Sequence, residues 1–206
     1  MGELVRVDDG GAVRTVTLAR PERRNALNAP MLEELTAMFA VDPPAAERVT
    51  VIRAEGPVFC AGVDLKERDS NGMAGSAIGI ETMLDAVQNY PLPVVAAVEG
   101  DAIAGGNELA LHSDLVVAVS TARFGMSLAQ IGLAPSWFLA KKILEVCGPV
   151  IAREMLLLGD PLSSTRMAHL GLIHRVAEPD DFDATGSPWP VVEESPQCLG
   201  WCARHT

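Results

Sequence analysis

Short apolar strand patterns alternate with helical patterns along this chain, and that alternation restricts its possible folds more than any other feature. Period-two patterns at Leu4–Asp8 and Val13–Leu18, separated by Asp9-Gly10-Gly11, predict a β-hairpin. A helical face at Pro30–Ala40 and a buried strand at Val49–Ala54 follow. Strands and helices in this order are typical of an α/β fold.

The same order continues in the second part of the chain. From Ser127 to about Leu170 the pattern is mainly helical, and Ser136 is expected to cap a helix over Trp137–Val146. The elements predicted before that region are a polar, glycine-rich loop at Asp69–Gly75, a helix at Ile78–Asn89, a strand at Val94–Val98, a helix at Gly106–His112 and a strand at Leu115–Val119.

Residues 184–206 differ from the rest of the chain. The composition changes near Asp183, and Pro, Trp and Cys residues without periodicity follow, so we expect an atypical, poorly ordered tail. Cys198, Cys202 and His205 lie there, but three potential ligands without a fourth are a weak zinc signal, and we expect no metal. The predicted organisation is one domain over residues 1–183 followed by this tail.

Charge and hydropathy argue against two classes of partner. The 27 acidic and 16 basic residues give a net charge of −11, and no basic block interrupts the acidity, so nucleic acid is not an expected partner. No apolar run approaches the roughly 18 residues that span a bilayer, and the N-terminus lacks a basic segment followed by an apolar one. We therefore expect a soluble, cytoplasmic protein that has no membrane partner.

A glycine-containing segment, Val98–Ala110, runs from an apolar strand through small residues into a helix. Gly105 and Gly106 at the helix start let backbone N–H groups approach a ligand, and first-turn donors have no partner within the helix. This arrangement suits an oxygen that develops negative charge. Glu108 follows Gly105 by about one turn, so its carboxylate can face the same volume as the Gly105 N–H. Taken alone, Glu108 could equally complement the helix dipole.

A second segment of small residues, Pro57–Glu67, follows the strand at Val49–Ala54. Its Gly62–Val63 backbone can supply another N–H donor, and Lys66 can supply an ammonium group for a phosphate. The alternative is an ordinary turn with a solvent-facing helix start. Each segment alone is a weak signal.

Together the two segments resemble the paired signatures of the crotonase superfamily, the enoyl-CoA hydratase/isomerase family. The first is similar to F-x-A-G-x-D-L-K-E and the second, at Gly105–Ala110, to G-G-x-E-L-A, in this order and about forty residues apart. The resemblance covers about residues 1–180, including Arg20–Asn28, which is similar to the family's first coenzyme-A-contacting turn. It implies a crotonase-like spiral of strand–strand–helix (ββα) units.

The resemblance also implies a mechanism. The N–H groups of Val63 and Gly105 would form an oxyanion hole for the thioester oxygen, and Glu108 would be the catalytic acid/base. Stabilising the thioester enolate in this way needs no cofactor, because coenzyme A is part of the substrate.

Substrate-binding residues follow from the same resemblance. The Ala61–Gly62 backbone would lie near the adenine, Arg24 and Lys66 would meet phosphates, and Ala26 and Asp64 belong to the same two binding segments. Family members are usually trimers or dimers of trimers, so a homotrimer or hexamer is implied.

The sequence departs from the family's pattern at the second hydratase glutamate. That residue follows a Phe-Gly-x-Pro sequence, and the matching position here is Leu128. The acid that enoyl-CoA isomerases place in a Pro-Glu-Gly stretch is also absent, because the corresponding residues are Pro135-Ser136-Trp137. We expect Leu128 and Trp137 to form an apolar wall beside the substrate.

Two other polar residues are weaker candidates. Asp101 is a residual candidate for a second carboxylate. His112 lies four residues after Glu108 on the same helix face, so it could hydrogen-bond the Glu108 carboxylate, or it could be a capped or semi-exposed helical histidine.

A single carboxylate suits reactions that need one proton shuttle or none. The expected function is hydration or isomerisation of an enoyl-CoA. The alternatives are a methylmalonyl-CoA-type decarboxylase and a non-catalytic acyl-CoA-binding paralogue. Because family members continue beyond the position of Asp183 with helices that close the active site, we also expect that the helical C-terminal part is truncated or replaced.

Overall fold

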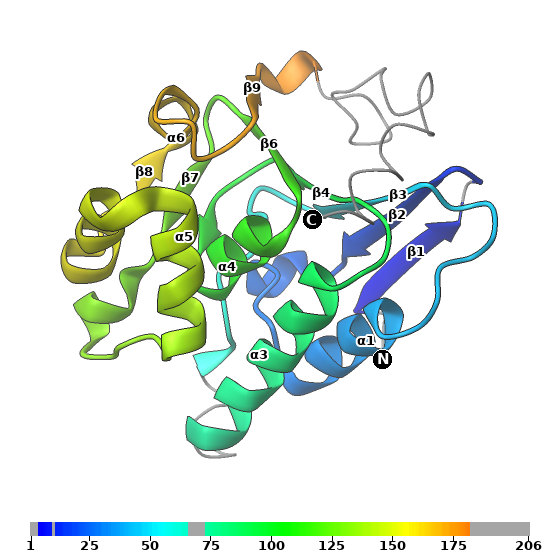
Figure 1. The fold of residues 1–206 in the computed structure, drawn as a ribbon, viewed down its shortest axis with the longest axis horizontal. Helices are drawn as coiled ribbons and strands as arrows, with labels where there is room; N and C mark the ends of the chain where they lie inside the picture. The colour runs from blue at the N-terminus through cyan, green and yellow to red at the C-terminus, as the bar shows by residue number, and fades with distance from the viewer. Residues whose placement is uncertain (1–3, 10, 66–72, 182–206) are drawn as a thin grey trace.

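A six-stranded sheet forms the centre of the computed structural model, which describes residues 4–9, 11–65 and 73–181 (Figure 1). The first two strands form the predicted antiparallel hairpin, and all other neighbours pair in parallel. The α/β fold expected from the sequence is therefore confirmed. In spatial order the strands are β1 (Val5–Asp9), β2 (Val13–Leu18), β3 (Val49–Ala54), β4 (Val94–Val98), β6 (Leu115–Val119) and β9 (Arg175–Ala177).

Helices connect these strands. Asn28 caps the first of them, since its side-chain oxygen accepts a hydrogen bond from the Met31 N–H at 3.2 Å. Within the described residues the helices are α1 (Ala29–Phe39), α3 (Met73–Gln88), α4 (Gly105–His112), α5 (Trp137–Arg153) and α6 (Ser164–His169), with short 3-10 turns at Pro21–Arg23, Ser127–Ile131 and Pro179–Asp181 and a π-helical turn at Glu154–Leu158.

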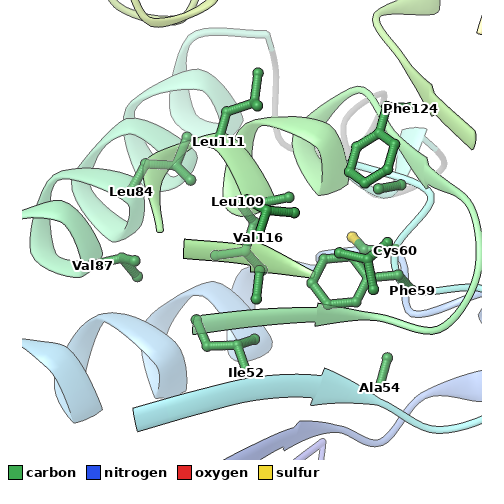
Figure 2. Packing of buried hydrophobic residues seen from close by; sticks show 14 of the residues in the cluster. Ile52, Ala54, Phe59, Cys60, Leu84, Val87, Leu109, Leu111, Val116 and Phe124 are labelled. Carbon is green, nitrogen blue, oxygen red and sulfur yellow. The ribbon is translucent and has the colours of Figure 1, made fainter. Parts of the chain in front are cut away.

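The main hydrophobic core lies between the sheet and the helices. Strands in parallel sheets are buried on both faces, and β4 is buried at each of its five positions. Figure 2 shows Ile52 of β3, Leu84 and Val87 of α3, Leu109 of α4 and Val116 of β6 gathered in one cluster. The core therefore holds α3 and α4 against the sheet.

A second, three-stranded sheet was not predicted. It consists of β5 (Ala102–Ile103), β7 (Arg123–Gly125) and β8 (Leu162–Ser163), in that order. Strands of two or three residues are too short for a period-two pattern to reveal. This sheet matters for the site because β5 leads directly into α4.

The predicted strands at Val49–Ala54, Val94–Val98 and Leu115–Val119 have the bounds expected. The predicted loop at Asp69–Gly75 is wrong at its end, because α3 already begins at Met73. A single glycine costs a helix only about 1 kcal/mol, so Gly75 does not stop it. The remainder of that loop and the tail at 184–206 lie outside the described residues. Within those residues no helix is both long and apolar enough to cross a bilayer.

α5 begins after its cap Ser136, as predicted, but extends beyond the predicted end at Val146. The Ser136 side chain accepts a hydrogen bond from the Leu139 N–H at 3.4 Å. The helix kinks at Gly148, where φ is 64°, and continues to Arg153. The non-helical backbone at Gly148 is compatible with the Pro149 that follows, because the residue before a proline avoids the helical region.

Candidate active site

Two glycine-containing segments touch each other backbone to backbone. A Cβ built on Gly62, where φ is 88°, would lie 2.9 Å from the Ala104 Cβ and 3.0 Å from the Gly105 nitrogen. A Cβ built on Gly106 would lie 2.3 Å from the Cys60 carbonyl oxygen. Any larger residue at these positions would separate the segments, so glycine is needed here for close approach.

Backbone hydrogen bonds hold the two segments in register. The Ile103 N–H donates to the Cys60 carbonyl at 2.9 Å, and the Cys60 N–H donates to the Asp101 carbonyl at 3.2 Å. The Ala104 N–H donates to the Gly125 carbonyl at 2.7 Å, which anchors the start of α4 to β7. Ala104 itself has φ of 49°, an uncommon value for alanine that allows the strand to turn sharply into the helix.

The Val63 and Gly105 amides have no hydrogen-bond acceptor among the described residues. Leu27 is hydrogen-bonded to the two neighbours of Val63. Its carbonyl accepts from the Asp64 N–H at 2.9 Å, and its N–H donates to the Gly62 carbonyl at 2.8 Å, so neither bond uses the Val63 N–H. Neither the Val63 N–H nor the Gly105 N–H donates to another described residue. Gly105 is also the first residue of α4, where backbone donors lack helical partners and the dipole is positive.

The predicted turn at Arg20–Asn28 is hydrogen-bonded to the segment that contains Gly62. Asn25, with φ of 51°, donates from Nδ2 to the carbonyls of Glu55 and Val58, each at 2.8 Å. The Arg20 N–H donates to the Asn25 side-chain oxygen at 2.8 Å. These hydrogen bonds therefore hold the turn against the segment.

Four predicted substrate-binding residues of this region lie close to one another, and the carboxylate of one of them, Asp64, is paired with Arg20. The Arg24 carbonyl accepts from the Ala61 N–H at 3.0 Å, so the exposed Arg24 lies beside Ala61. The Ala26 carbonyl accepts from the Arg20 guanidinium at 2.8 Å, and the same guanidinium contacts the Asp64 carboxylate at 2.9 Å. Asp64 thus stabilises the loop through Arg20. Lys66, expected to meet a phosphate, lies outside the described residues.

A cavity of about 190 Å³ opens beside the two amides. It is mostly apolar, and its lining includes four of the predicted site residues: Ala61, Val63, Gly105 and Leu128. The other lining residues are Leu65, Ile80, Glu81, Ala104, Met126, Ser127, Ile131, Leu133, Ala134, Pro135, Ser136 and Leu139.

The prediction that Trp137 forms part of the apolar wall is wrong. Trp137 is 72% exposed and does not line the cavity. The buried face of α5 includes Leu139, Ile143 and Cys147. Trp137 precedes Leu139 by two positions, so its side chain points about 200° away from that residue. Leu139 supplies the wall instead.

Glu108 is completely buried on α4, with an exposed fraction of 0%. Neither carboxylate oxygen has a hydrogen-bond partner among the described residues, and Glu108 does not line the cavity that Gly105 lines. Burial raises the pKa of Glu108 well above its ordinary value, and the charge of Lys142 opposes that shift only in part. Burial therefore favours the neutral, protonated form of this carboxyl group.

His112 is buried as well, at 4% exposed, so the expectation of a semi-exposed histidine is wrong. Its Nδ1 lies 2.8 Å from the Glu108 backbone carbonyl and 3.6 Å from the Glu108 Oε2. The ring therefore hydrogen-bonds the backbone of Glu108 rather than its carboxylate. Burial lowers the pKa of His112 to about 4, and its ring stacks on Phe138 with centroids 5.3 Å apart. His112 is consequently neutral near pH 7.

Asp101 does not supply a second carboxylate to the cavity. Its side chain binds the Nε of Arg123 at 3.1 Å in an ion pair on the surface side of β7, away from the lining residues. Among the described residues no cluster of three or more His, Cys, Asp or Glu side chains could hold a metal. Cys198, Cys202 and His205 fall outside those residues.

Glu81, which lines the cavity from α3, was missed by the sequence analysis. It lies within an ordinary helical pattern, and no glycine or turn signal marks it. Its neighbour Ile80 contacts the segment that contains Gly105, since a Cβ built on Gly105 would lie 2.7 Å from the Ile80 Cδ1. Only the packing of α3 against α4 brings this carboxyl group to the site.

Comparison with known proteins shows which family this chain resembles. The family model for enoyl-CoA hydratase/isomerase matches residues 8–186. A probable enoyl-CoA hydratase, echA6 of Mycobacterium bovis, is 33% identical over 184 residues, which cover 88% of this chain and 74% of that protein.

Solved structures share the fold across nearly the whole chain. An enoyl-CoA hydratase/carnithine racemase from Magnetospirillum magneticum superimposes with a TM-score of 0.89 at 29% identity, covering 99% of this chain and 80% of that one. An enoyl-CoA hydratase from Mycobacterium smegmatis gives 0.86 at 32% identity, covering 97% and 77%. The chain therefore belongs to the enoyl-CoA hydratase/isomerase family.

Proposed function

We propose that this enzyme binds an acyl-CoA thioester with its carbonyl oxygen between the N–H groups of Val63 and Gly105. The observation that carries this proposal is a pair of amides, without an acceptor among the described residues, on two backbone segments that touch at Gly62 and Gly105. When the α-carbon of a thioester becomes carbanionic, negative charge moves to the carbonyl oxygen. Each pre-positioned donor then contributes about 3 kcal/mol to the enolate-like transition state.

Glu108 is the proposed acid/base. Its carboxyl oxygens have no hydrogen-bond partner among the described residues, and its raised pKa suits a group that both gives and takes protons. Asn107, the preceding residue, also has both side-chain polar atoms buried without a partner among the described residues. Buried polar atoms without partners are rare in native proteins and concentrate at functional positions.

The proposed reaction is hydration or isomerisation of an enoyl-CoA with a single proton-transferring carboxylate. Leu128 lines the cavity at the position expected for the second hydratase glutamate, which favours a mechanism with one shuttle. Relatives named as enoyl-CoA hydratases and as an enoyl-CoA isomerase/hydratase support both reactions.

Two alternatives each have one supporting observation. The apolar cavity wall at Leu128 would favour loss of carbon dioxide from a methylmalonyl-type thioester, because it withholds solvation from a carboxylate. The absence of Glu108 from the cavity lining would suit a non-catalytic acyl-CoA-binding protein.

Turnover by the Glu108→Gln variant separates these possibilities. We expect its kcat on crotonyl-CoA or a 3-enoyl-CoA to fall about 10²- to 10⁴-fold, while binding of the substrate changes little. Glu33→Gln, an exposed position on α1, serves as the matched control and should retain full activity. Equal rates in wild type and Glu108→Gln would remove Glu108 from the mechanism. Turnover of methylmalonyl-CoA alone would favour decarboxylation, and binding without turnover of any substrate would favour the non-catalytic alternative.

We also propose that the strand–strand–helix units form the spiral of the family and that the protein assembles as a homotrimer or hexamer. Exposed aliphatic residues near the end of α5 and in the π-helical turn, Val150, Leu157 and Leu158, support an association surface. Sedimentation equilibrium on the full chain tests this, and a monomer at micromolar concentration would contradict it.

A further inference from the structure

Glu81 is the one ionisable side chain among the described residues that line the cavity. The other lining groups are apolar side chains, backbone and the hydroxyls of Ser127 and Ser136. The Ser136 hydroxyl already accepts the hydrogen bond that caps α5. A single carboxyl group in such a cavity has a strong influence on which ligands can bind, because a small number of polar groups usually determines the specificity of an apolar pocket.

The Glu81 carboxyl group is available to a ligand. It is partly buried and makes no hydrogen bond or ion pair with another described residue. Ile80, the adjacent residue, packs against Gly105 and lines the same cavity. Glu81 therefore lies beside the proposed thioester site, in the same cavity as Leu128.

We propose that Glu81 determines acyl-group specificity: it disfavours acyl groups that carry a carboxylate and accepts neutral acyl groups, with a preference for those that carry a hydroxyl. This inference rests on the proposed binding of acyl-CoA thioesters. A carboxylate accepts hydrogen bonds strongly, so a hydroxyl on the acyl chain can donate to Glu81 inside the cavity. An anionic acyl group would instead lie close to a like charge in surroundings that offer no compensating cation among the lining residues.

The size of the effect follows from Coulomb's law. Two unit charges roughly 7 Å apart, at an effective permittivity of about 20 to 40, repel enough to change a binding constant about sevenfold to fiftyfold. A discrimination of about tenfold against anionic acyl groups is therefore expected. The same repulsion would disfavour a malonyl-type substrate and hence the decarboxylase alternative.

Binding of saturated ligands tests the inference without requiring turnover. Titration calorimetry on the full chain would compare pentanoyl-CoA, 5-hydroxypentanoyl-CoA and glutaryl-CoA, which differ only at the end of a five-carbon acyl group. Wild type should bind glutaryl-CoA about tenfold more weakly than pentanoyl-CoA and should bind the hydroxy compound most tightly. In Glu81→Gln the penalty for glutaryl-CoA should fall below about twofold, and in Glu81→Lys the order should reverse.

Controls distinguish the specificity of the cavity from general charge effects. Glu33→Gln changes the net charge equally at a distant exposed site and should retain the wild-type order. Three results would each overturn the inference: equal affinities in wild type, an unchanged penalty in Glu81→Gln, or an equal change for all ligands including free coenzyme A. Because none of these ligands contains the reacting double bond, failure of enoyl-CoA turnover would reject the proposed reaction and leave this result standing.

Discussion

Gly106→Ala should separate the two backbone segments that carry the Val63 and Gly105 amides. A methyl group at this position would lie 2.3 Å from the Cys60 carbonyl oxygen and 2.7 Å from the Cys60 Cβ. Ordinary van der Waals contact begins at 3.4 Å, so the carbonyl would have to move by about 1.1 Å. Cys60 also bridges to Ala102 of β5, which leaves the carbonyl little freedom to move alone.

Two opposing terms set the expected loss of stability. Alanine favours a helix interior by about 1 kcal/mol over glycine, whereas overpacking a close-packed contact costs about 1 to 3 kcal/mol and more where backbone must shift. We therefore expect the free energy of unfolding to fall by about 1 to 3 kcal/mol. A displacement of about 1 Å between the amides should also lower kcat about 100-fold, because misplacement on that scale disrupts a pre-positioned site.

Urea unfolding and turnover of crotonyl-CoA measure the two effects. Gly79→Ala is the matched control, because the nearest contact of its added methyl is the Leu32 Cδ1 at 3.4 Å, an ordinary distance. That variant should be neutral or slightly stabilised and fully active. A Gly106→Ala protein with wild-type stability and wild-type kcat would refute the claim that this glycine holds the two segments together.

Three further perturbations test other parts of the structure. Asn25→Ala leaves the carbonyls of Glu55 and Val58 without their donor and should lower the free energy of unfolding by about 2 to 4 kcal/mol, measured by urea titration. Acidification from pH 6.5 to about 4 should lower the free energy of unfolding of wild type, relative to that of His112→Gln, by on the order of 3 kcal/mol. The reason is that His112 has a lowered pKa in the folded protein, so the unfolded chain binds the proton more readily. Parallel curves of unfolding free energy against pH for the two proteins would contradict this. Trp137→Ala should change stability by less than about 0.5 kcal/mol and kcat/KM by less than about twofold, and a larger loss of activity would return this exposed residue to the site.

The sequence was sufficient for most of the main sheet because its strands are fully apolar runs bounded by turns. Val94–Val98 is preceded by Pro93, is followed closely by Gly100 and is buried at every position, so its length and bounds were readable without tertiary information. The two glycine-containing segments were equally readable, since close backbone approach leaves its mark as glycines at strand exits.

Other features depended on packing that a linear pattern does not encode. β5 and β8 have two residues each, too few to show a period. His112 was placed on the correct face of α4, but its burial depends on Phe138 of another helix. Glu81 and Trp137 show the same limit in opposite directions: a charged residue lines the cavity and an aromatic one faces solvent, because the positions of α3 and α5 decide which side chains point inward.

The site consequently separates into two parts that should respond differently to mutation. The oxyanion part is made of backbone, and its geometry depends on Gly62, Gly105 and Gly106 lying in contact across two segments. Changes there should lower stability and activity together, because the contact that positions the amides also closes the core around Cys60. The acyl part is made of side chains that line the cavity, and Glu81 among them is only partly buried and makes no hydrogen bond or ion pair with another described residue. Changes there should alter the choice of substrate while the free energy of unfolding stays within about 0.5 kcal/mol, so that a family member can acquire a new acyl specificity without rebuilding its catalytic backbone.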